Sequence, residues 1–134
     1  MSSELRLELE AGRSSFAPGE RIRGTATWRL SEPPEGLELR LFWYTEGKGE
    51  RDIDIVDRIA VHSGSREGNH EFAFTAPEAP LSFSGKLISL IWAIELVRLP
   101  EGEAGRLEIT LSRSGEEIRI GVPEAGDLEA TEPA

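Results

Sequence analysis

The 134-residue sequence contains no cysteine, which excludes disulfides, thiolate nucleophiles and cysteine-ligated zinc or iron–sulfur sites. Basic residues are also scarce. The 25 acidic residues outnumber the 15 basic ones, which gives a formal net charge of −10. Nucleic acid needs a basic footprint on its protein partner, and anionic lipid attracts basic segments. The sequence therefore predicts neither a nucleic-acid partner nor docking on a membrane surface.

A long apolar run is missing as well. The densest one spans residues 87–97, with Ser89 and Glu95 as its only polar members, whereas a membrane-spanning helix needs about 20 residues. The start, "MSSELRLELE", has neither the basic region nor the apolar region of a signal peptide. We therefore expect no membrane insertion and a cytoplasmic location. Among the basic residues only Lys48 and Lys86 are lysines, and this arginine bias favours a GC-rich bacterial genome.

Sustained helical periodicity is absent, and alternation with a period of two takes its place. Such alternation is typical of half-buried strands. It covers eight stretches separated by turn signals, at residues 4–10, 21–30, 37–46, 51–62, 70–76, 86–98, 106–111 and 116–122. The pattern predicts an all-β, immunoglobulin-like antiparallel β-sandwich of about eight strands. We expect the stretch 86–98 in the middle of a sheet, and the last two stretches to form a hairpin around "SRSG".

The fourth stretch contains a break in its phase. Ile53, Ile55, Ile59 and Val61 share one parity, but Asp57 intrudes between them. We predict a β-bulge near Val56–Asp57. Residues 1–122 are expected to form a single domain. Residues 123–134 are acidic and poor in aromatic and β-branched residues, which predicts a disordered tail.

Two blocks of residues resemble the amino-terminal domain of the arrestin family, especially α-arrestins and their bacterial relatives. The resemblance spans residues 4–99. The first block places an aromatic before Pro-Gly-acidic and an early glycine in the next strand. It comprises Phe16, Pro18, Gly19, Glu20, Ile22 and Gly24. The second is "GNHEFAFTAPEAPLSFSGKLISLIWAIELV", with Gly68, His70, Phe72, Phe74, Pro77, Pro80, Ser82, Phe83, Gly85, Lys86 and Trp92 at the matching positions.

The departures from that family limit what the resemblance implies. The sequence has no room for the family's second sandwich and no Pro-Pro-x-Tyr motif, since "PPEG" at residues 33–36 lacks the tyrosine. The basic phosphate-sensing patch of receptor-binding arrestins has no counterpart either. What the resemblance implies is an arrestin-like adaptor or protein-binding module without catalysis.

Candidate catalytic and metal-binding residues are few. His62 and His70 lie near Asp52, Asp54 and Asp57 in the sequence, but without metal-ligand spacing, so we expect solvated positions. Asp52 and Asp54 share one strand face side by side, which does not match the opposed carboxyls of a glycosidase. The segment "SFSG" does not fit a nucleophile elbow, and "GKG" is too short for a phosphate loop. We expect no enzyme activity, no catalytic residue, no metal and no cofactor.

Two of the predicted strands are apolar on both faces. The third and sixth strands of an immunoglobulin-like sandwich lie side by side, so their outer faces would merge into one patch. This predicted interaction surface comprises Phe42, Tyr44, Leu87, Ile91, Ala93 and Val97. A protein partner or a second copy in a homodimer would cover it. Loops and arginine stems could cover it instead, and a β-sandwich that binds a small ligand or carbohydrate is the alternative function.

Overall fold

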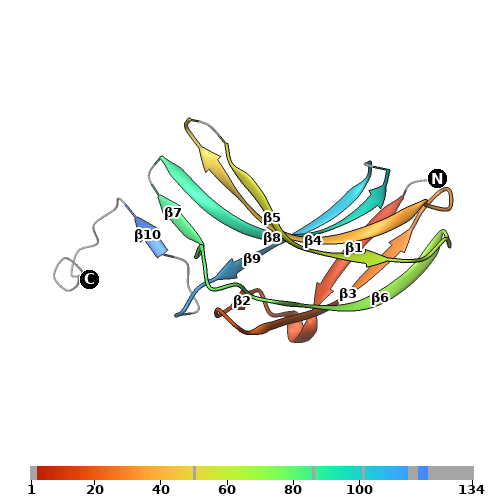
Figure 1. Ribbon diagram of the computed structural model, residues 1–134, viewed down its shortest axis with the longest axis horizontal. Coiled ribbons are helices and arrows are strands. Elements are labelled where there is room, and N and C mark those ends of the chain that lie inside the picture. Colours follow the sequence, from red (N-terminus) through yellow and green to blue (C-terminus); the bar gives the residue numbers. More distant parts are fainter. Residues whose placement is uncertain (1–2, 50, 86, 101, 115–117, 121–134) are drawn as a thin grey trace.

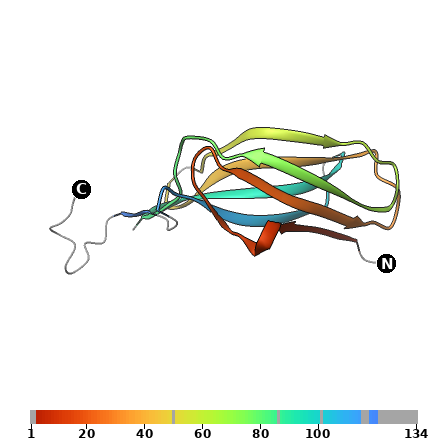
Figure 2. The ribbon, with the colours of Figure 1, turned by 90° about the horizontal axis from the view of Figure 1, so that it is seen from below.

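The computed structural model describes residues 3–49, 51–85, 87–100, 102–114 and 118–120. The predicted tail and the boundary at residue 122 lie outside these residues. Within them, two β-sheets pack face to face (Figure 1), which confirms the predicted all-β sandwich. Figure 2, viewed from below, shows the strands of the two sheets running in roughly the same direction, as in aligned sandwiches.

The smaller sheet consists of three antiparallel strands in the order β1-β3-β6. They are β1 (Glu4–Leu9), β3 (Arg21–Arg29) and β6 (Glu67–Thr75). Their alternating sequences bury one face: in β3, Ile22, Ala26 and Trp28 point into the core, whereas Arg21, Arg23 and Arg29 are exposed. The Pro18-Gly19 turn before β3 is confirmed, with Glu20 N donating to Ala17 O at 3.0 Å and φ of +85° at Gly19.

The larger sheet is built around β8 (Ile88–Leu99), which confirms the central place predicted for this stretch. One edge of β8 pairs with β4 (Gly36–Gly47) along its whole length. The other edge is shared by β9 (Ala104–Leu111) and β7 (Phe83–Gly85). β5 (Ile53–Val61) pairs with β4 and lies at the edge of the sheet. The predicted adjacency of the third and sixth expected strands is therefore confirmed.

The hairpin expected between the last two stretches is wrong. β10 (Ile118–Ile120) pairs in parallel with β7, and not with β9. A second short strand, β2 (Ser15–Phe16), pairs in parallel with the end of β9. Strands this short show no alternation, and β7 lies in a segment that its prolines mark as a link. Ser82 explains the path, because its backbone N donates to Leu111 O and its Oγ accepts from Leu111 N, both at 2.9 Å. The chain leaving β9 therefore starts beside β7.

The core fills the space between the inner faces of the two sheets. Its most deeply buried members include Ile22, Leu37, Leu39, Leu41, Phe74, Trp92, Ile94 and Leu96. The even positions of β8 face inward, as predicted. Trp92 has no exposed surface, and its indole Nε1 donates to Pro80 O at 2.7 Å. This bond ties the proline-containing link to the centre of the larger sheet.

The predicted bulge in β5 is confirmed. Leu41 is opposite Asp57 and Phe42 is opposite Ile55, so Val56 has no partner in the register. The extra residue reverses which side of the sheet the odd positions occupy. Ile59 and Val61 lie opposite the inward Leu39 and Leu37, whereas Ile53 and Ile55 lie opposite Tyr44 and Phe42 on the outer face. Their shared parity therefore does not put all four on one face.

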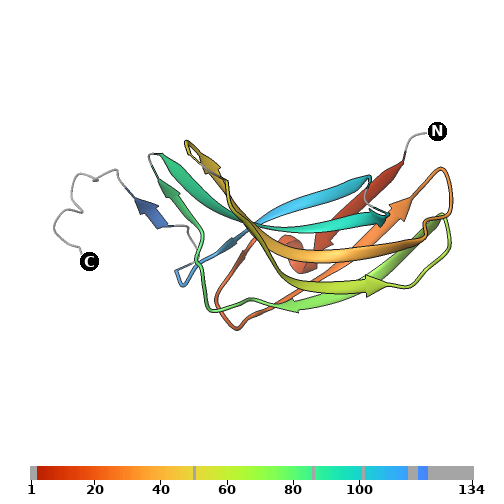
Figure 3. The same cartoon turned by 45° about the horizontal axis from the view of Figure 1, so that its top comes forward.

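One end of the larger sheet extends beyond the smaller sheet. The β4–β5 hairpin and the β7–β8 connection rise away from β1, β3 and β6 there (Figures 1 and 3). They are joined where Lys48 N donates to Leu87 O at 2.9 Å. A side chain at Gly47, whose φ is +135°, would overlap that same carbonyl. The close approach requires glycine and fixes the hairpin against the start of β8.

Candidate functional site

The predicted interaction surface lies on the outer face of the larger sheet, but half of it is buried. Phe42 is 2% exposed, Ala93 0% and Val97 2%, so other parts of the chain already cover these three residues. Tyr44 and Ile91 are half-buried, and Leu87 is 63% exposed. The structure therefore does not present the six residues as one open apolar patch.

Arg106 provides part of the cover. Phe42 and Tyr44 stack with their ring centroids 5.9 Å apart. The Arg106 guanidinium lies 5.1 Å from the centroid of Phe42 and 5.2 Å from that of Tyr44. Its Nη2 also lies 3.4 Å from Oε2 of Glu95. A guanidinium over an aromatic face is attracted by the ring's negative charge density, and its stem covers apolar surface. Cover by an arginine side chain, the alternative to a bound partner given in the sequence analysis, thus applies to Phe42.

Tyr44 is held at a border between apolar and polar surface. Its hydroxyl donates to Glu108 Oε2 at 2.9 Å. Partial burial raises the pKa of Tyr44 above its usual value, and the hydrogen bond and negative charge of Glu108 raise this pKa further, against an opposing effect of Arg106. The phenol is therefore protonated at neutral pH and has a fixed orientation.

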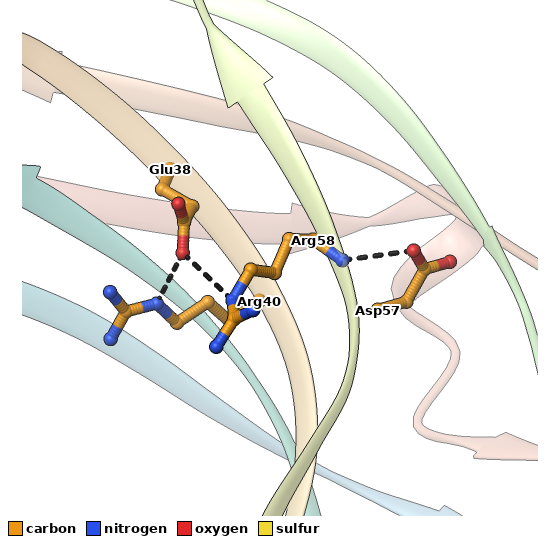
Figure 4. Close-up of polar contacts among 4 residues, drawn as sticks. All are labelled: Glu38, Arg40, Asp57 and Arg58. Carbon is orange, nitrogen blue, oxygen red and sulfur yellow. Dashed lines mark hydrogen bonds and ion pairs between the residues drawn. The ribbon is translucent and has the colours of Figure 1, made fainter.

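The other end of the outer face is charged (Figure 4). Glu38 lies between two arginines, with its Oε2 2.6 Å from Arg40 Nε and 3.4 Å from Arg58 Nε. The backbone N of Arg58 donates to Asp57 Oδ1 at 2.9 Å. The side chains of Glu38 and Arg40 are largely covered. Glu38 is thus the ion-pair partner of both arginines at this end.

The bulge brings two residues to this face that sequence reasoning did not place there. Ile53 and Ile55 lie beside Tyr44 and Phe42, and Ile91 flanks Tyr44 from β8. We refer to Ile53, Ile55, Tyr44 and Ile91 as the apolar end. Ile53 is 65% exposed. The signal that could have found them is the phase slip itself, because a single extra residue in a strand transfers the preceding residues to the opposite face.

A small hollow lies next to the apolar end. It forms where β9 leaves β8 to pair with β2, and it has a volume of about 250 Å³. Its lining includes Ile91, Glu108, Thr110 and Ser14. Pockets for small ligands usually measure about 300–1,000 Å³, so this hollow matches a single side chain better than a whole ligand. A larger hollow of about 630 Å³ is lined mainly by charged and polar residues of β1, β3 and β6.

The residues considered for catalysis or metal binding do not come together into a site. His62 and His70 are exposed, and so are Asp52, Asp54 and Asp57. Among the described residues, no group of three or more metal-ligating side chains is placed to hold a metal ion. The described part of the chain also contains no helix long and apolar enough to span a membrane.

The residues shared with the arrestin pattern have structural contacts. A side-chain Cβ at Gly68 would come 2.6 Å from Cζ2 of Trp28, and one at Gly24 would come 2.8 Å from Cζ of Phe72. Glu20 is bound to Arg13, with Oε2 and Nη1 2.7 Å apart, and its other oxygen accepts from Ala17 N at 2.9 Å. The hydrogen bonds from Arg13 and Ala17 lower the pKa of Glu20. These contacts are between neighbouring strands and within the turn before β3, and Gly24 and Phe72 also belong to the lining of the larger hollow.

No protein-family model and no curated protein matches the chain. Among solved structures, the chain is similar to Spo0M, a sporulation control protein from Bacillus subtilis, with a TM-score of 0.58 and 17% identity. The match covers 83% of this chain and 49% of Spo0M, so the chain spans about half the length of that protein. At this identity the likeness concerns the fold alone.

Other similar structures are more distant. A superoxide reductase (neelaredoxin) from Ignicoccus hospitalis matches with a TM-score of 0.46 and 12% identity, over 81% of this chain and 80% of its own. The alkylpurine DNA glycosylase AlkC from Pseudomonas fluorescens matches with a TM-score of 0.42 and 12% identity, over 81% of this chain and 30% of its own. These two likenesses carry no argument about what this chain does.

Proposed function

We propose that this chain is a non-catalytic protein-interaction module of the arrestin-like type, which binds a protein partner at its apolar end. The observation that supports this most directly is the position of Ile53. The bulge at Val56 turns this isoleucine outward beside Tyr44, where it is 65% exposed. Exposed apolar residues that gather on one face, rimmed by polar ones, are typical of interaction sites.

The setting of Tyr44 also suits binding. Tyrosine is enriched among the residues that contribute most to protein interfaces. Here Glu108 and Arg106 already fix the orientation of the ring. A side chain that is ordered before binding loses little conformational entropy on binding. The hollow next to Ile91 offers space for one partner side chain.

A β-sandwich that binds small ligands or carbohydrates has less support. Sugar binding of this kind uses exposed aromatic faces, but Phe42 is almost fully buried, and Arg106 lies over both Phe42 and Tyr44. Specific binding on a glycan array, lost in Tyr44→Ala, would favour this alternative over the protein-interaction module.

The test of the proposal compares Ile53→Glu with Thr27→Glu. Both positions are exposed strand residues, but Thr27 lies on the smaller sheet. The immobilised wild type should capture a defined partner from an extract of the source cells, identified by mass spectrometry. Ile53→Glu should abolish capture, because binding would bury the new carboxylate without a counterion. Thr27→Glu should leave capture intact, and both variants should keep their unfolding free energy within about 0.5 kcal/mol.

The same pair of variants tests a homodimer. If the partner is a second copy, light scattering should detect a dimer for the wild type and Thr27→Glu and a monomer for Ile53→Glu. Equal capture and equal oligomeric state for all three proteins would contradict a role of the apolar end in binding.

A further inference from the structure

The edge of the larger sheet at β5 is open. β5 pairs with β4 on one side, and no strand of the described residues pairs with its other side. β6, the next strand along the chain, belongs to the smaller sheet. An open edge offers unpaired backbone groups to another chain, and proteins usually blunt such edges.

On the side of the bulge nearest the β4–β5 hairpin, the backbone groups that face outward belong to Ile53 and Ile55. Immediately before β5, Thr45 N donates to Asp52 O at 3.0 Å and Asp52 N donates to Thr45 Oγ1 at 2.9 Å, so the backbone groups of Asp52 face β4. In an antiparallel ladder every second residue faces the partner strand in this way, and the backbone groups of the residues in between point away from the partner strand. Ile53 and Ile55 are these intervening residues. Their N–H and C=O groups point to the open edge.

Apolar and acidic side chains lie on opposite faces of this edge. Ile53 and Ile55 lie on the outer face with Tyr44. Asp52 and Asp54 alternate with them, and both are exposed. Asp57 adds a third exposed acid beyond the bulge, and of the two nearby bases Arg58 is engaged by Glu38, which leaves Arg51. The edge is thus apolar on one face and acidic on the other.

This charge pattern disfavours a second copy as the occupant. If two β5 edges paired antiparallel with their isoleucines on one face, Asp52 or Asp54 of one copy would lie opposite an aspartate of the other. Like charges directly opposite each other destabilise a strand pair. A basic residue at those positions of the added strand would instead form an ion pair.

We propose that the Ile53–Ile55 edge binds an extended segment of a partner protein, in which apolar residues alternate with lysine or arginine, as an added β-strand. The main-chain hydrogen bonds provide affinity, and the alternating side chains provide specificity. The apolar residues of the segment extend the apolar end, and its basic residues face Asp52 and Asp54. This inference rests on the proposed function and specifies the partner's chemistry.

The test uses a blocked nine-residue synthetic peptide in which Lys alternates with Ile and Val. Its affinity is measured by calorimetry, and its site by amide shifts and hydrogen exchange. Binding should slow exchange of the Ile53 and Ile55 amides. A peptide with Glu in place of Lys should bind at least tenfold more weakly. N-methylation of the backbone amides facing β5 should also cost about tenfold or more, because two hydrogen bonds are lost.

A charge-reversal pair separates local recognition from the attraction of a basic peptide to an acidic protein. Asp54→Lys should reverse the preference, so that the Glu peptide binds better. Glu71→Lys changes the net charge equally at an exposed position of the smaller sheet, and it should leave the preference for the Lys peptide unchanged.

Three results would overturn the inference: no loss of affinity on N-methylation, no reversal in Asp54→Lys, or amide protection outside β5. If any of these occurred while Ile53→Glu still abolished partner capture, the interaction module would stand and the added strand would be wrong. If neither the peptide experiment nor the capture experiment gave the expected result, both the added strand and the interaction module would be wrong.

Discussion

At the scale of single residues, several close contacts of this fold join residues that are far apart in the chain. Gly68 and Ser82 lie in the second block of the resemblance noted in the sequence, and their partners, Trp28 and Leu111, are distant in the chain. The cover over Phe42 likewise comes from Arg106 on β9. Alternation shows on which face a residue lies, but not which long side chain of another strand crosses that face. For this reason the sequence left open whether an arginine or a partner covers Phe42.

Tyr44 allows a test of its environment, because it is the only tyrosine in the chain. Phenolate absorbance during an alkaline titration should give a midpoint above the ordinary value of about 10, since burial and Glu108 raise the pKa of Tyr44. Glu108→Gln should lower the midpoint while leaving it raised, because burial is the larger cause.

The sign of the linked effect on stability follows from the raised pKa. The folded protein keeps the phenol proton at pH values where the unfolded chain has lost it. The stabilising contribution is therefore complete below the unfolded pKa and is lost as the pH rises through the folded pKa. A Tyr44 midpoint at or below that of free tyrosine would contradict the geometry described for this residue.

At the scale of strands, alternation predicted well where a strand is long. β3 and β8 follow from it, and so does the bulge in β5. The short strands β2 and β7 could not be predicted, because two or three residues carry no period. β10 lies within the predicted stretch 116–122, but its pairing with β7 could not be predicted, because contacts such as that of Ser82 with Leu111 set it.

The phase of β8 leads to a stability prediction. Trp92→Ala should lower the free energy of unfolding by about 3–5 kcal/mol, because the ring is fully buried and its indole bonds Pro80. Glu95→Ala should cost less than about 1 kcal/mol, because Glu95 lies on the outer face and its partner Arg106 is well exposed. Denaturant unfolding monitored by circular dichroism measures both changes. If Glu95→Ala lowered the free energy of unfolding more than Trp92→Ala, the inward and outward faces of β8 would be assigned the wrong way round.

At the scale of the whole molecule, the sequence predicted two packed sheets but not where they meet along their edges. That seam lies between β1 of the smaller sheet and β9 of the larger one. A side chain at Gly105 would overlap the carbonyl oxygen of Leu5. Neither strand's pattern reveals this approach, because alternation describes faces and not edges.

Gly105→Ala should therefore destabilise the protein by about 1–3 kcal/mol, the usual cost of overpacking, and should speed amide exchange in β1. Gly102→Ala is the matched control, since a Cβ there would meet nothing closer than Pro100 O at 3.5 Å. Equal stability and equal β1 exchange in the two variants would show that the seam is looser than described.

The pairing of Ser15 with Thr110 and of Phe16 with Leu111 also has a consequence for synthesis of the chain. β2 leaves the ribosome long before β9, the strand that completes it and closes the seam with β1. Until then the apolar face of the smaller sheet lacks its full cover. Folds dominated by such distant contacts form slowly, and their incomplete forms are prone to aggregate. Residues 1–103 already hold 18 acidic and 12 basic residues, so chains that have not yet formed β9 repel one another through their excess negative charge.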